Sequence, residues 1–308
     1  GIKIGRRSTD LMLIDFSGGI RAERRLRYRY PQPDEVFGFI ETSLRDIGSD
    51  LTADQRDRIC GIGVATPFDL WRWHAQAGAP KTSLQAWKEL CPVTEIARFS
   101  PLRCFVINDA TAACRAEHMF GASRAWRDSI YFFIASFAGG GVVLNNSVYE
   151  GSMGNAGALG PLPTRRPDGS DGRLLDTASI RELERRLVEV NIDPIVLGTQ
   201  TQDRSRLEEH VAKWLEDTAD ALARAALATC AVIDFQAVVI DGAMPPSLRA
   251  RLVDRVRAEL PTLDARGLIR PVVAEGEIGA HASALGAAAK PLIAQYLMDT
   301  HAGFAPAS

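Results

Sequence analysis

Residues 107–114 read I-N-D-A-T-A-A-C, and this short segment lies where a strand is followed by a helix. The apolar residues 104–107 predict a buried strand, and residues 110–120 predict a helix. Asn108 and Asp109 therefore follow the carboxyl end of a strand, which is where α/β sheets bind ligands. Asp accepts hydrogen bonds and Asn both donates and accepts them, so the pair can hold two adjacent hydroxyl groups. Asn or Asp before a helix is also a common N-cap, and the sequence leaves both roles open.

The residues before this segment predict a hairpin, a helix and a strand. Residues 10–16 have a strand pattern, Ser17-Gly18-Gly19 reads as a turn, and residues 20–30 alternate like the second strand of a hairpin. Residues 33–47 have the periodicity of an amphipathic helix, and residues 59–65 read as a short buried strand. The chain therefore opens with a hairpin, a helix and a strand.

The residues after this segment repeat the order. Residues 129–136 and 141–144 read as two strands, residues 207–232 as a long amphipathic helix, residues 237–240 as a buried strand and residues 278–297 as a final helix. A hairpin, a helix and a parallel strand thus occur twice, which suggests a duplicated lobe.

The composition is that of an ordinary globular protein long enough for two lobes. Of 308 residues, 46% are hydrophobic and 24% are charged, and 36 basic residues stand against 38 acidic ones. This balance gives no electrostatic footprint for nucleic acid, and no apolar run is long enough to span a membrane. The five cysteines form no C-x-x-C pair, so we expect a reduced, cytoplasmic protein. The chain begins with Gly1, which suggests a processed or incomplete N-terminus.

Two glycine-rich segments follow residues 107–114. Residues 136–151 read S-F-A-G-G-G-V-V-L-N-N-S-V-Y-E-G, and residues 154–163 read G-N-A-G-A-L-G-P-L-P. With residues 107–114, they resemble the sugar-binding centre of the ROK family, which contains sugar kinases and sugar-responsive repressors. The resemblance runs from the first strand to the last helix.

The resemblance implies a fold and a division of the chain. The expected fold is α/β, with two lobes of the actin-like ATPase (ribonuclease H-like) type and a ligand cleft between them. Residues 1–108 are expected to form the small lobe, with residues 284–308 packing back on it as a C-terminal helix. Residues 109–283 are expected to form the large lobe, which carries ligand binding and dimerisation.

The resemblance also implies which residues contact the sugar. The matching Asn-Asp pair binds sugar in the family, and the Asp is the catalytic base of the kinases. The expected sugar-binding residues here are therefore Asn108, Asp109, Gly140, Asn155 and Asp176. Asp176 matches a Glu that touches sugar in relatives, although an acid at this place can equally cap the next helix.

Both phosphate loops depart from the kinase pattern. ROK kinases begin with D-x-G-G-T, whose Asp helps to place the metal, whereas residues 3–8 read K-I-G-R-R-S. Lysine cannot bind Mg²⁺, which prefers oxygen ligands. The second loop is G-T-G-x-G-G-G in the kinases, but here Phe137 replaces a glycine and its ring should exclude a phosphate. Only degenerate phosphate loops remain, at Gly5, Ser136 and Gly139. Arg6 and Arg7 can be read simply as surface charges on a hairpin.

The zinc-binding features of the family are missing too. ROK sugar kinases carry E-x-G-H, whose Glu and His bind sugar, where this chain has Ala158, Leu159, Gly160 and Pro161. The following cysteine-rich motif supplies zinc thiolates in the family, but residues 165–176 contain no cysteine. Zinc commonly takes four Cys or His ligands. We therefore predict no zinc and no other cofactor, with ATP and Mg²⁺ only if the chain is a kinase.

Three functions remain open. The favoured one is the sugar-binding body of a ROK-type transcriptional regulator, whose winged helix-turn-helix lies outside this chain. This body would bind a sugar or sugar derivative, form a homodimer or tetramer, and reach DNA only through that outside segment, with no membrane contact. One alternative is a sugar kinase with Asp109 as general base. The other is a dimeric pseudokinase without a DNA-binding segment.

Overall fold

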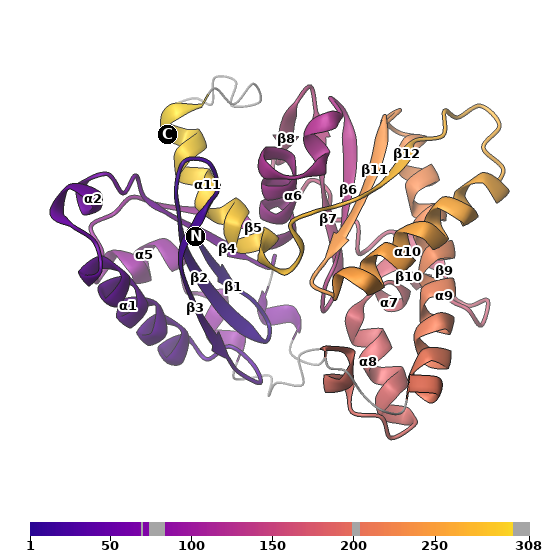
Figure 1. The fold of residues 1–308 in the computed structure, drawn as a ribbon, viewed down its shortest axis with the longest axis horizontal. Helices are drawn as coiled ribbons and strands as arrows, with labels where there is room; N and C mark the ends of the chain where they lie inside the picture. The colour runs from indigo at the N-terminus through magenta and orange to yellow at the C-terminus, as the bar shows by residue number, and fades with distance from the viewer. Residues whose placement is uncertain (69, 74–83, 199–203, 298–308) are drawn as a thin grey trace. The chain divides into compact units, whose positions relative to one another are not determined.

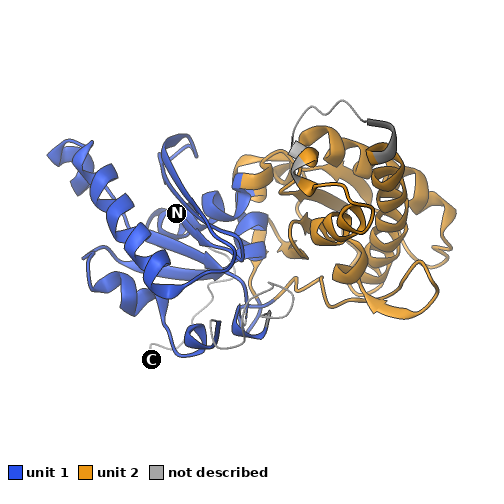
Figure 2. Ribbon diagram, turned by 90° about the horizontal axis from the view of Figure 1, so that it is seen from below, with its two compact units in different colours: residues 1–116, 151–155, 281–308 blue, residues 117–150, 156–280 orange. Residues whose placement is uncertain are grey.

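The computed structural model describes residues 1–68, 70–73, 84–198 and 204–297. These residues group into two compact units (Figure 2). Unit 1 contains residues 1–116, 151–155 and the chain from 281 onward, and unit 2 contains residues 117–150 and 156–280. The predicted lobe boundary at residues 108 and 109 stays a prediction.

The sheet of unit 1 combines an antiparallel hairpin with parallel strands (Figure 1). Its order is β3-β2-β1-β4-β5, in which β1 pairs antiparallel with β2 and parallel with β4. β4 and β5 are also parallel. The strands are β1 (Ile2–Ile4), β2 (Ser8–Ile14), β3 (Ile20–Arg27), β4 (Ile62–Thr66) and β5 (Cys104–Asn108).

Helices pack on both faces of this sheet, because neighbouring residues of a strand point to opposite faces. Val64 belongs to the apolar cluster under α1 (Pro33–Ser49), whereas the next residue, Ala65, packs with Ala287 of α11 (Ala282–Tyr296). The approach of α11 is very close, since a Cβ on Gly63 would lie 1.7 Å from the Ala287 carbonyl oxygen. The remaining helices that begin in unit 1 are α2 (Ala53–Asp57), η1 (Leu70–Trp73), η2 (Ala86–Lys88), α5 (Pro92–Ala97) and α6 (Asp109–Phe120).

The sheet of unit 2 repeats the topology of unit 1. Its order is β8-β7-β6-β11-β12, so the first three strands form an antiparallel meander and the last two run parallel to β6. The repetition predicted from the sequence is therefore present. The strands are β6 (Ser129–Ile134), β7 (Ala138–Leu144), β8 (Ser147–Tyr149), β11 (Ala237–Gly242) and β12 (Val272–Glu275).

The helices of unit 2 form a second layer and support a small hairpin (Figure 1). α10 (Pro246–Glu259) packs on β11 and β12, and α9 (Arg204–Cys230) packs on α10, α7 (Leu174–Thr177) and α8 (Ile180–Glu189). The hairpin of β9 (Pro163–Arg165) and β10 (Asp171–Arg173) lies against α9. The short helices are η3 (Ala122–Ala125), η4 (Pro194–Gly198), η5 (Leu260–Thr262) and η6 (Gly279–His281).

Several elements differ from the sequence expectation, and α10 and β12 were not predicted at all. β1 was not predicted from periodicity, because three residues are too few to show alternation. The β9–β10 hairpin was not predicted either. The last α-helix begins at Ala282 rather than at residue 278, since Gly279 adopts a φ of 69° that an α-helix cannot contain. Within the described part of the chain, no helix is long and apolar enough to cross a membrane.

Candidate functional site

The predicted sugar-binding pair lies at the carboxyl edge of the unit 1 sheet. Asn108 is the last residue of β5 and pairs in register with Thr66 of β4. Asp109 is the first residue of α6. Because β1 is parallel to β4, the loop after Ile4 leaves the sheet at this same edge. The edge therefore brings Gly5 and Arg6 together with Asn108 and Asp109.

Asn108 and Asp109 both act as caps of α6. The Oδ1 atom of Asn108 accepts hydrogen bonds from the backbone N–H groups of Ala110 at 3.0 Å and Thr111 at 3.1 Å. The Oδ1 atom of Asp109 accepts from Ala110 at 2.9 Å. Each side chain has a second polar atom, so capping and ligand binding do not exclude one another. Sugar binding by this pair stays a prediction.

Lys3 is held in an ion pair across the first hairpin. Its Nζ atom lies 3.3 Å from Oδ2 of Asp10, the residue opposite it in the β1–β2 register. Arg25 of β3 pairs with the same carboxylate from the other side, and the Ser8 hydroxyl donates to it at 3.1 Å. Asp10 is only 2% exposed, and the two cations neutralise its charge. This cluster does not fit Mg²⁺, which requires oxygen ligands that carry uncompensated negative charge.

The loop between β1 and β2 is fixed by Tyr28. The Tyr28 hydroxyl donates to the Gly5 carbonyl oxygen at 2.7 Å, and the Tyr28 backbone N–H donates to the Arg7 carbonyl at 3.1 Å. Burial raises the pKa of Tyr28, so its hydroxyl stays a donor at neutral pH. The Gly5 backbone N–H closes the turn onto the Ser8 carbonyl at 2.9 Å. Arg6 and Arg7 therefore extend from a well-defined turn.

One reading of the sequence made Arg6 and Arg7 surface charges; Arg7 is exposed, whereas Arg6 is half-buried. Burial lowers the pKa of the Arg6 guanidinium, and the negative charge of Asp109 acts in the opposite direction. Arg6 and Asp109 are therefore close enough to interact electrostatically. Sequence reasoning missed this pairing, because it depends on the register of three strands.

Phe137 fills the turn between β6 and β7 in unit 2. The turn is closed by the Ala135 backbone N–H, which donates to the Phe137 carbonyl at 3.2 Å, and it is tied to α8 through Ile180. The Arg181 guanidinium of α8 lies 5.8 Å from the centre of the Phe137 ring, in a cation–π contact. The turn therefore presents an aromatic ring and an arginine in place of the glycines expected for a phosphate loop.

Gly140 has a packing role. It lies within β7, where an added Cβ would meet the Tyr131 carbonyl oxygen at 2.1 Å and a methyl carbon of Leu159 at 2.4 Å. The neighbouring Gly141 lies close to Gly157 in the same way. Close packing of the 157–160 segment on β7 therefore explains these glycines without a ligand. A sugar contact by Gly140 stays a prediction.

The two remaining predicted residues lie on different units. Asn155 is half-buried in the segment 151–155 of unit 1. Asp176 lies in α7 of unit 2, where it accepts hydrogen bonds from the guanidinium groups of Arg173 at 3.0 Å and Arg166 at 3.3 Å. Burial acts to raise the pKa of Asp176, but the hydrogen bonds and charges of these arginines outweigh it and lower the pKa. Asp176 thus anchors the β9–β10 hairpin.

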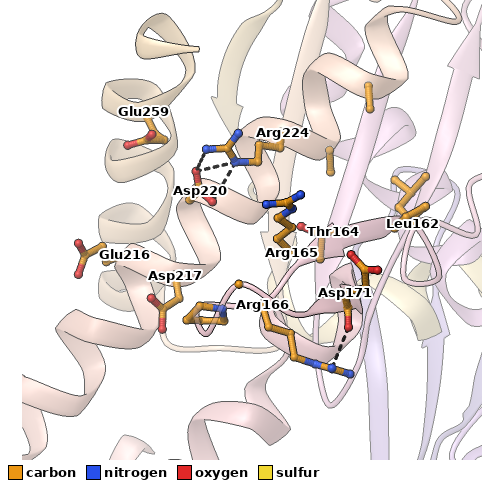
Figure 3. A pocket seen from close by; sticks show the side chains of 15 residues that line it. Leu162, Thr164, Arg165, Arg166, Asp171, Glu216, Asp217, Asp220, Arg224 and Glu259 are labelled. Carbon is orange, nitrogen blue, oxygen red and sulfur yellow. Dashed lines mark hydrogen bonds and ion pairs between the residues drawn. The ribbon is translucent and has the colours of Figure 1, made fainter. Parts of the chain in front are cut away.

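A groove of about 1010 Å³, lined by both charged and apolar residues, lies between this hairpin and α9 (Figure 3). Its walls carry charges that pair within unit 2. Asp217 contacts Arg186 at 2.7 Å and Lys213 at 3.2 Å, and Asp220 contacts Arg224 at 2.8 Å. The acidic residues of the α9 wall therefore pair within α9 and with α8, and Arg166 of the hairpin wall pairs with Asp176. Across the described ranges, no group of three or more His, Cys, Asp or Glu residues could hold a metal ion.

Comparison with known proteins places the chain in a family. The sequence model of the ROK family matches residues 1–292. The uncharacterized protein y4fQ of Sinorhizobium fredii is 27% identical over 303 residues, which are 94% of this chain and 72% of y4fQ. The transcriptional dual regulator NagC of Escherichia coli is 28% identical over 61% of this chain and 47% of NagC. The bifunctional enzyme NanE/NanK of Brucella melitensis is 32% identical over 59% of this chain and 34% of the enzyme. The matches thus span about half of NagC and one third of NanE/NanK.

Solved structures share the fold. A ROK family glucokinase from Streptomyces griseus, solved with glucose and AMPPNP, superposes with a TM-score of 0.71 at 18% identity. The superposition covers 94% of this chain and 97% of the glucokinase chain. A ROK family transcriptional regulator homologous to the E. coli MLC protein superposes with a TM-score of 0.65 at 19% identity. The superposition covers 93% of this chain and 76% of the regulator chain. The expected actin-like ATPase fold is confirmed. Since a kinase and a regulator both have this fold, the fold does not separate the two functions.

Proposed function

Because the chain belongs to the ROK family, we propose that it is the sugar-binding body of a sugar-responsive transcriptional regulator and that it does not phosphorylate its sugar. The observation that carries the proposal is the ion pair that Lys3 of β1 makes with Asp10 of β2. In a sugar kinase this edge has to help place Mg²⁺, which neutralises the charge that develops on the transferred phosphoryl group. A lysine held by a buried carboxylate cannot do so.

The second phosphate loop supports the same proposal independently. The β6–β7 turn carries the Phe137 ring, which contacts Arg181, where the kinases have a glycine. Kinase activity would require changes in both units, because Lys3 belongs to unit 1 and Phe137 to unit 2. The Asn108–Asp109 pair, which serves to hold sugar hydroxyls, is retained.

In the proposed regulator, the sugar shifts an equilibrium between two conformations. A ligand can do this only if its affinity for the two conformations differs. The DNA-binding segment lies outside this chain, and the body acts as a homodimer or tetramer. The relatives are consistent with this proposal, since NagC is a DNA-binding regulator and the matched part covers 47% of it.

A sugar kinase is the second candidate. It is favoured by the position of Asp109, because a carboxylate at the carboxyl edge of a sheet can take the proton from an attacking hydroxyl group. NanE/NanK and the glucokinase are enzymes of the same family. On this alternative, ATP and Mg²⁺ are held by residues other than Lys3.

Calorimetry and an ADP-release assay on the purified chain separate the candidates. Sugars and sugar phosphates are titrated first, and ATP with Mg²⁺ is titrated separately. The proposal expects heat from at least one sugar or sugar derivative, no heat from ATP and no ADP release. ADP release that depends on both sugar and Mg²⁺ would establish the kinase, and silence toward every ligand would leave the pseudokinase.

The Asp109→Ala variant tests the position of the site. It should weaken ligand affinity by about tenfold or more, because a charged hydrogen bond to the ligand is lost. Its circular dichroism spectrum should match that of the parent. Glu41→Ala, which removes an exposed carboxylate of α1 paired with Arg45, is the matched control and should bind normally. Unchanged affinity in Asp109→Ala would show that the ligand does not bind at this edge of the sheet.

A further inference from the structure

We propose that two buried carboxylates, Glu117 and Asp241, form a latch on residues 277–279, and that the half made by Glu117 opens when this side chain is neutral. The latched segment lies in unit 2 and leads from β12 to α11, which belongs to unit 1. The latch goes beyond the proposed function, because its action does not depend on whether the chain is a regulator or a kinase.

Three consecutive backbone N–H groups of this segment donate to the two carboxylates. The N–H groups of Glu277 and Ile278 lie 3.0 Å and 3.1 Å from the Oε2 atom of Glu117. The next N–H group, that of Gly279, donates to the Oδ2 atom of Asp241 at 2.9 Å. Amides at the start of a helix have no acceptor within it, and η6 begins at Gly279. The two side chains therefore supply acceptors that the backbone of η6 does not.

Glu117 lies where the chain passes from one unit to the other. It is the first residue of unit 2 within α6, and the segment that it holds ends where the chain returns to unit 1 at residue 281. Its Oε1 atom also accepts from the Ala122 N–H group at 2.7 Å, which fixes the carboxylate against the turn after α6. One carboxylate thus joins, within unit 2, two segments through which the chain passes between the units.

The Asp241 half of the latch is supported by a cation. The Oδ1 atom of Asp241 accepts from the Arg249 guanidinium at 2.8 Å, and its Oδ2 atom also accepts from the Tyr131 hydroxyl at 3.0 Å. Arg249 donates to Glu275 as well, at 2.9 Å. Asp241 is fully buried, and a buried charge needs a partner of this kind. Arg249 therefore compensates the charge of Asp241.

The Glu117 half is held by uncharged backbone donors. Glu117 is fully buried, and the donors to its carboxylate are the N–H groups of Ala122, Glu277 and Ile278. Burial raises the pKa of Glu117, and so does the charge of Asp241, whereas the three N–H groups act to lower it. Glu117 therefore takes up a proton at a higher pH than an ordinary glutamate, whose pKa is about 4.3.

The other ionisable groups of the cluster favour this proton. They come from β6, β11, α10, β12 and the segment itself, and are Tyr131, Asp241, Arg249, Glu275 and the exposed Glu277. The buried and half-buried carboxylates of Glu117, Asp241 and Glu275 thus share one guanidinium. Uptake of a proton by Glu117 relieves the repulsion from Asp241.

The proton acts on the latch in one direction. An ionised carboxylate is the stronger acceptor, whereas a neutral carboxyl group turns one oxygen into a donor that faces N–H groups. The pKa of Glu117 is raised by folding, so its contribution to stability is present below the unfolded value and is lost as the pH rises through the folded pKa. Ionisation of Glu117 thus closes the latch at a cost in stability, and a proton releases it.

Hydrogen exchange, followed by NMR on the full chain over a range of pH, tests the latch amide by amide. Protection is expressed relative to the intrinsic exchange rate at each pH. We expect the protection of Glu277 and Ile278 to fall about tenfold as the pH falls through the pKa of Glu117, because a charged hydrogen bond becomes a neutral one. Gly279, which Asp241 holds, and residues 238–241 in the centre of the unit 2 sheet should keep their protection.

Variants assign the effect to Glu117. Glu117→Gln has nearly the same shape but cannot ionise, so the protection of Glu277 and Ile278 should be low and should no longer change with pH. Glu277→Gln is the matched control, because it neutralises an exposed carboxylate of the same segment and leaves the backbone N–H group in place. This control should keep the wild-type pH dependence. A merely structural role of Glu117 would lower protection in Glu117→Gln without any pH dependence in the wild type.

Three results overturn the latch. The first is protection of Glu277 and Ile278 that does not change with pH while the wild-type protein stays folded. The second is a pH dependence that persists in Glu117→Gln, which would assign the proton to another group of the cluster. The third is a parallel loss of protection at residues 277–279 and 238–241, which would mean that the whole unit opens. Should Glu117→Gln fail to fold, the wild-type titration decides by itself, because Gly279 and residues 238–241 are its internal controls.

Discussion

At the scale of single residues, the ion pairs of Asp10 explain how β1 accommodates a lysine at position 3. The Asp10 carboxylate is buried, and it is stabilised by Lys3 on one side and Arg25 on the other. Burial of a lone carboxylate is costly, so the two cations are required together with it. The three residues form a cross-strand ladder over β1, β2 and β3, which makes the lysine part of the fold of unit 1.

The ladder predicts the effect of removing its central charge. Asp10→Asn should lower the free energy of unfolding by about 2 kcal/mol, less than for a fully buried pair because both cations are partly exposed. Urea denaturation followed by circular dichroism measures this loss. Glu41→Gln, which removes the charge from an exposed pair with Arg45, should change stability by less than about 0.5 kcal/mol. Equal effects in the two variants would contradict the ladder.

At the scale of elements, the β9–β10 hairpin shows how a segment is ordered where zinc ligands are missing. Arg166 donates to the Asp171 carbonyl at 2.8 Å and to Asp176, and Arg173 also donates to Asp176. One carboxylate of α7 thus holds the turn of the hairpin through Arg166 and the strand β10 through Arg173. We expect a chelator to leave the melting temperature of the protein unchanged, in line with the prediction of no zinc.

The lowered pKa of Asp176 also predicts that the stability of the hairpin depends on pH. The pKa of Asp176 is lowered in the folded protein, so its ionised form contributes stability above the unfolded value of about 4. That contribution is lost as the pH falls through the lowered folded pKa. Asp176→Asn should open the hairpin more readily, by about 1 kcal/mol at pH 7, as measured by hydrogen exchange of residues 163–173. The difference from wild type should vanish at strongly acidic pH, and a difference that persists there would contradict the assignment.

The sequence predicted several of the longer elements, but it missed the short ones and the 14-residue helix α10. The helix over residues 33–47 and the long helix from 207 were recognisable because their apolar stripes repeat over several turns. β1 and the β9–β10 hairpin contain three residues per strand, so their pattern is too short to read. The Asn108–Asp109 pair was found from its place after a strand. The electrostatic interaction of Arg6 with Asp109 was not, because residues about 100 positions apart are brought together only by strand order.

At the scale of the whole molecule, the last helix completes the first unit. Unit 1 contains the first 116 residues and the chain from residue 281 onward, so α11 joins elements that come from the start of the chain. α11 packs against β4 and α6 at positions where the neighbouring residues have no room for a side chain. A Cβ on Gly63 would lie 1.7 Å from the Ala287 carbonyl oxygen, and one on Gly286 would lie 1.7 Å from that of Ala112.

These contacts leave no room for an additional methyl group between α11 and the sheet. Gly63→Ala should destabilise the protein by about 3 kcal/mol or more, because the clash is with backbone that cannot rotate away. Gly38→Ala is the matched control, since Gly38 lies in α1 with open space around it and alanine there should stabilise the helix by about 1 kcal/mol. Chemical denaturation measures both changes. Opposite signs in the two variants would place the restriction where α11 packs on β4, whereas a neutral Gly63→Ala would mean that α11 can move away from β4 without cost.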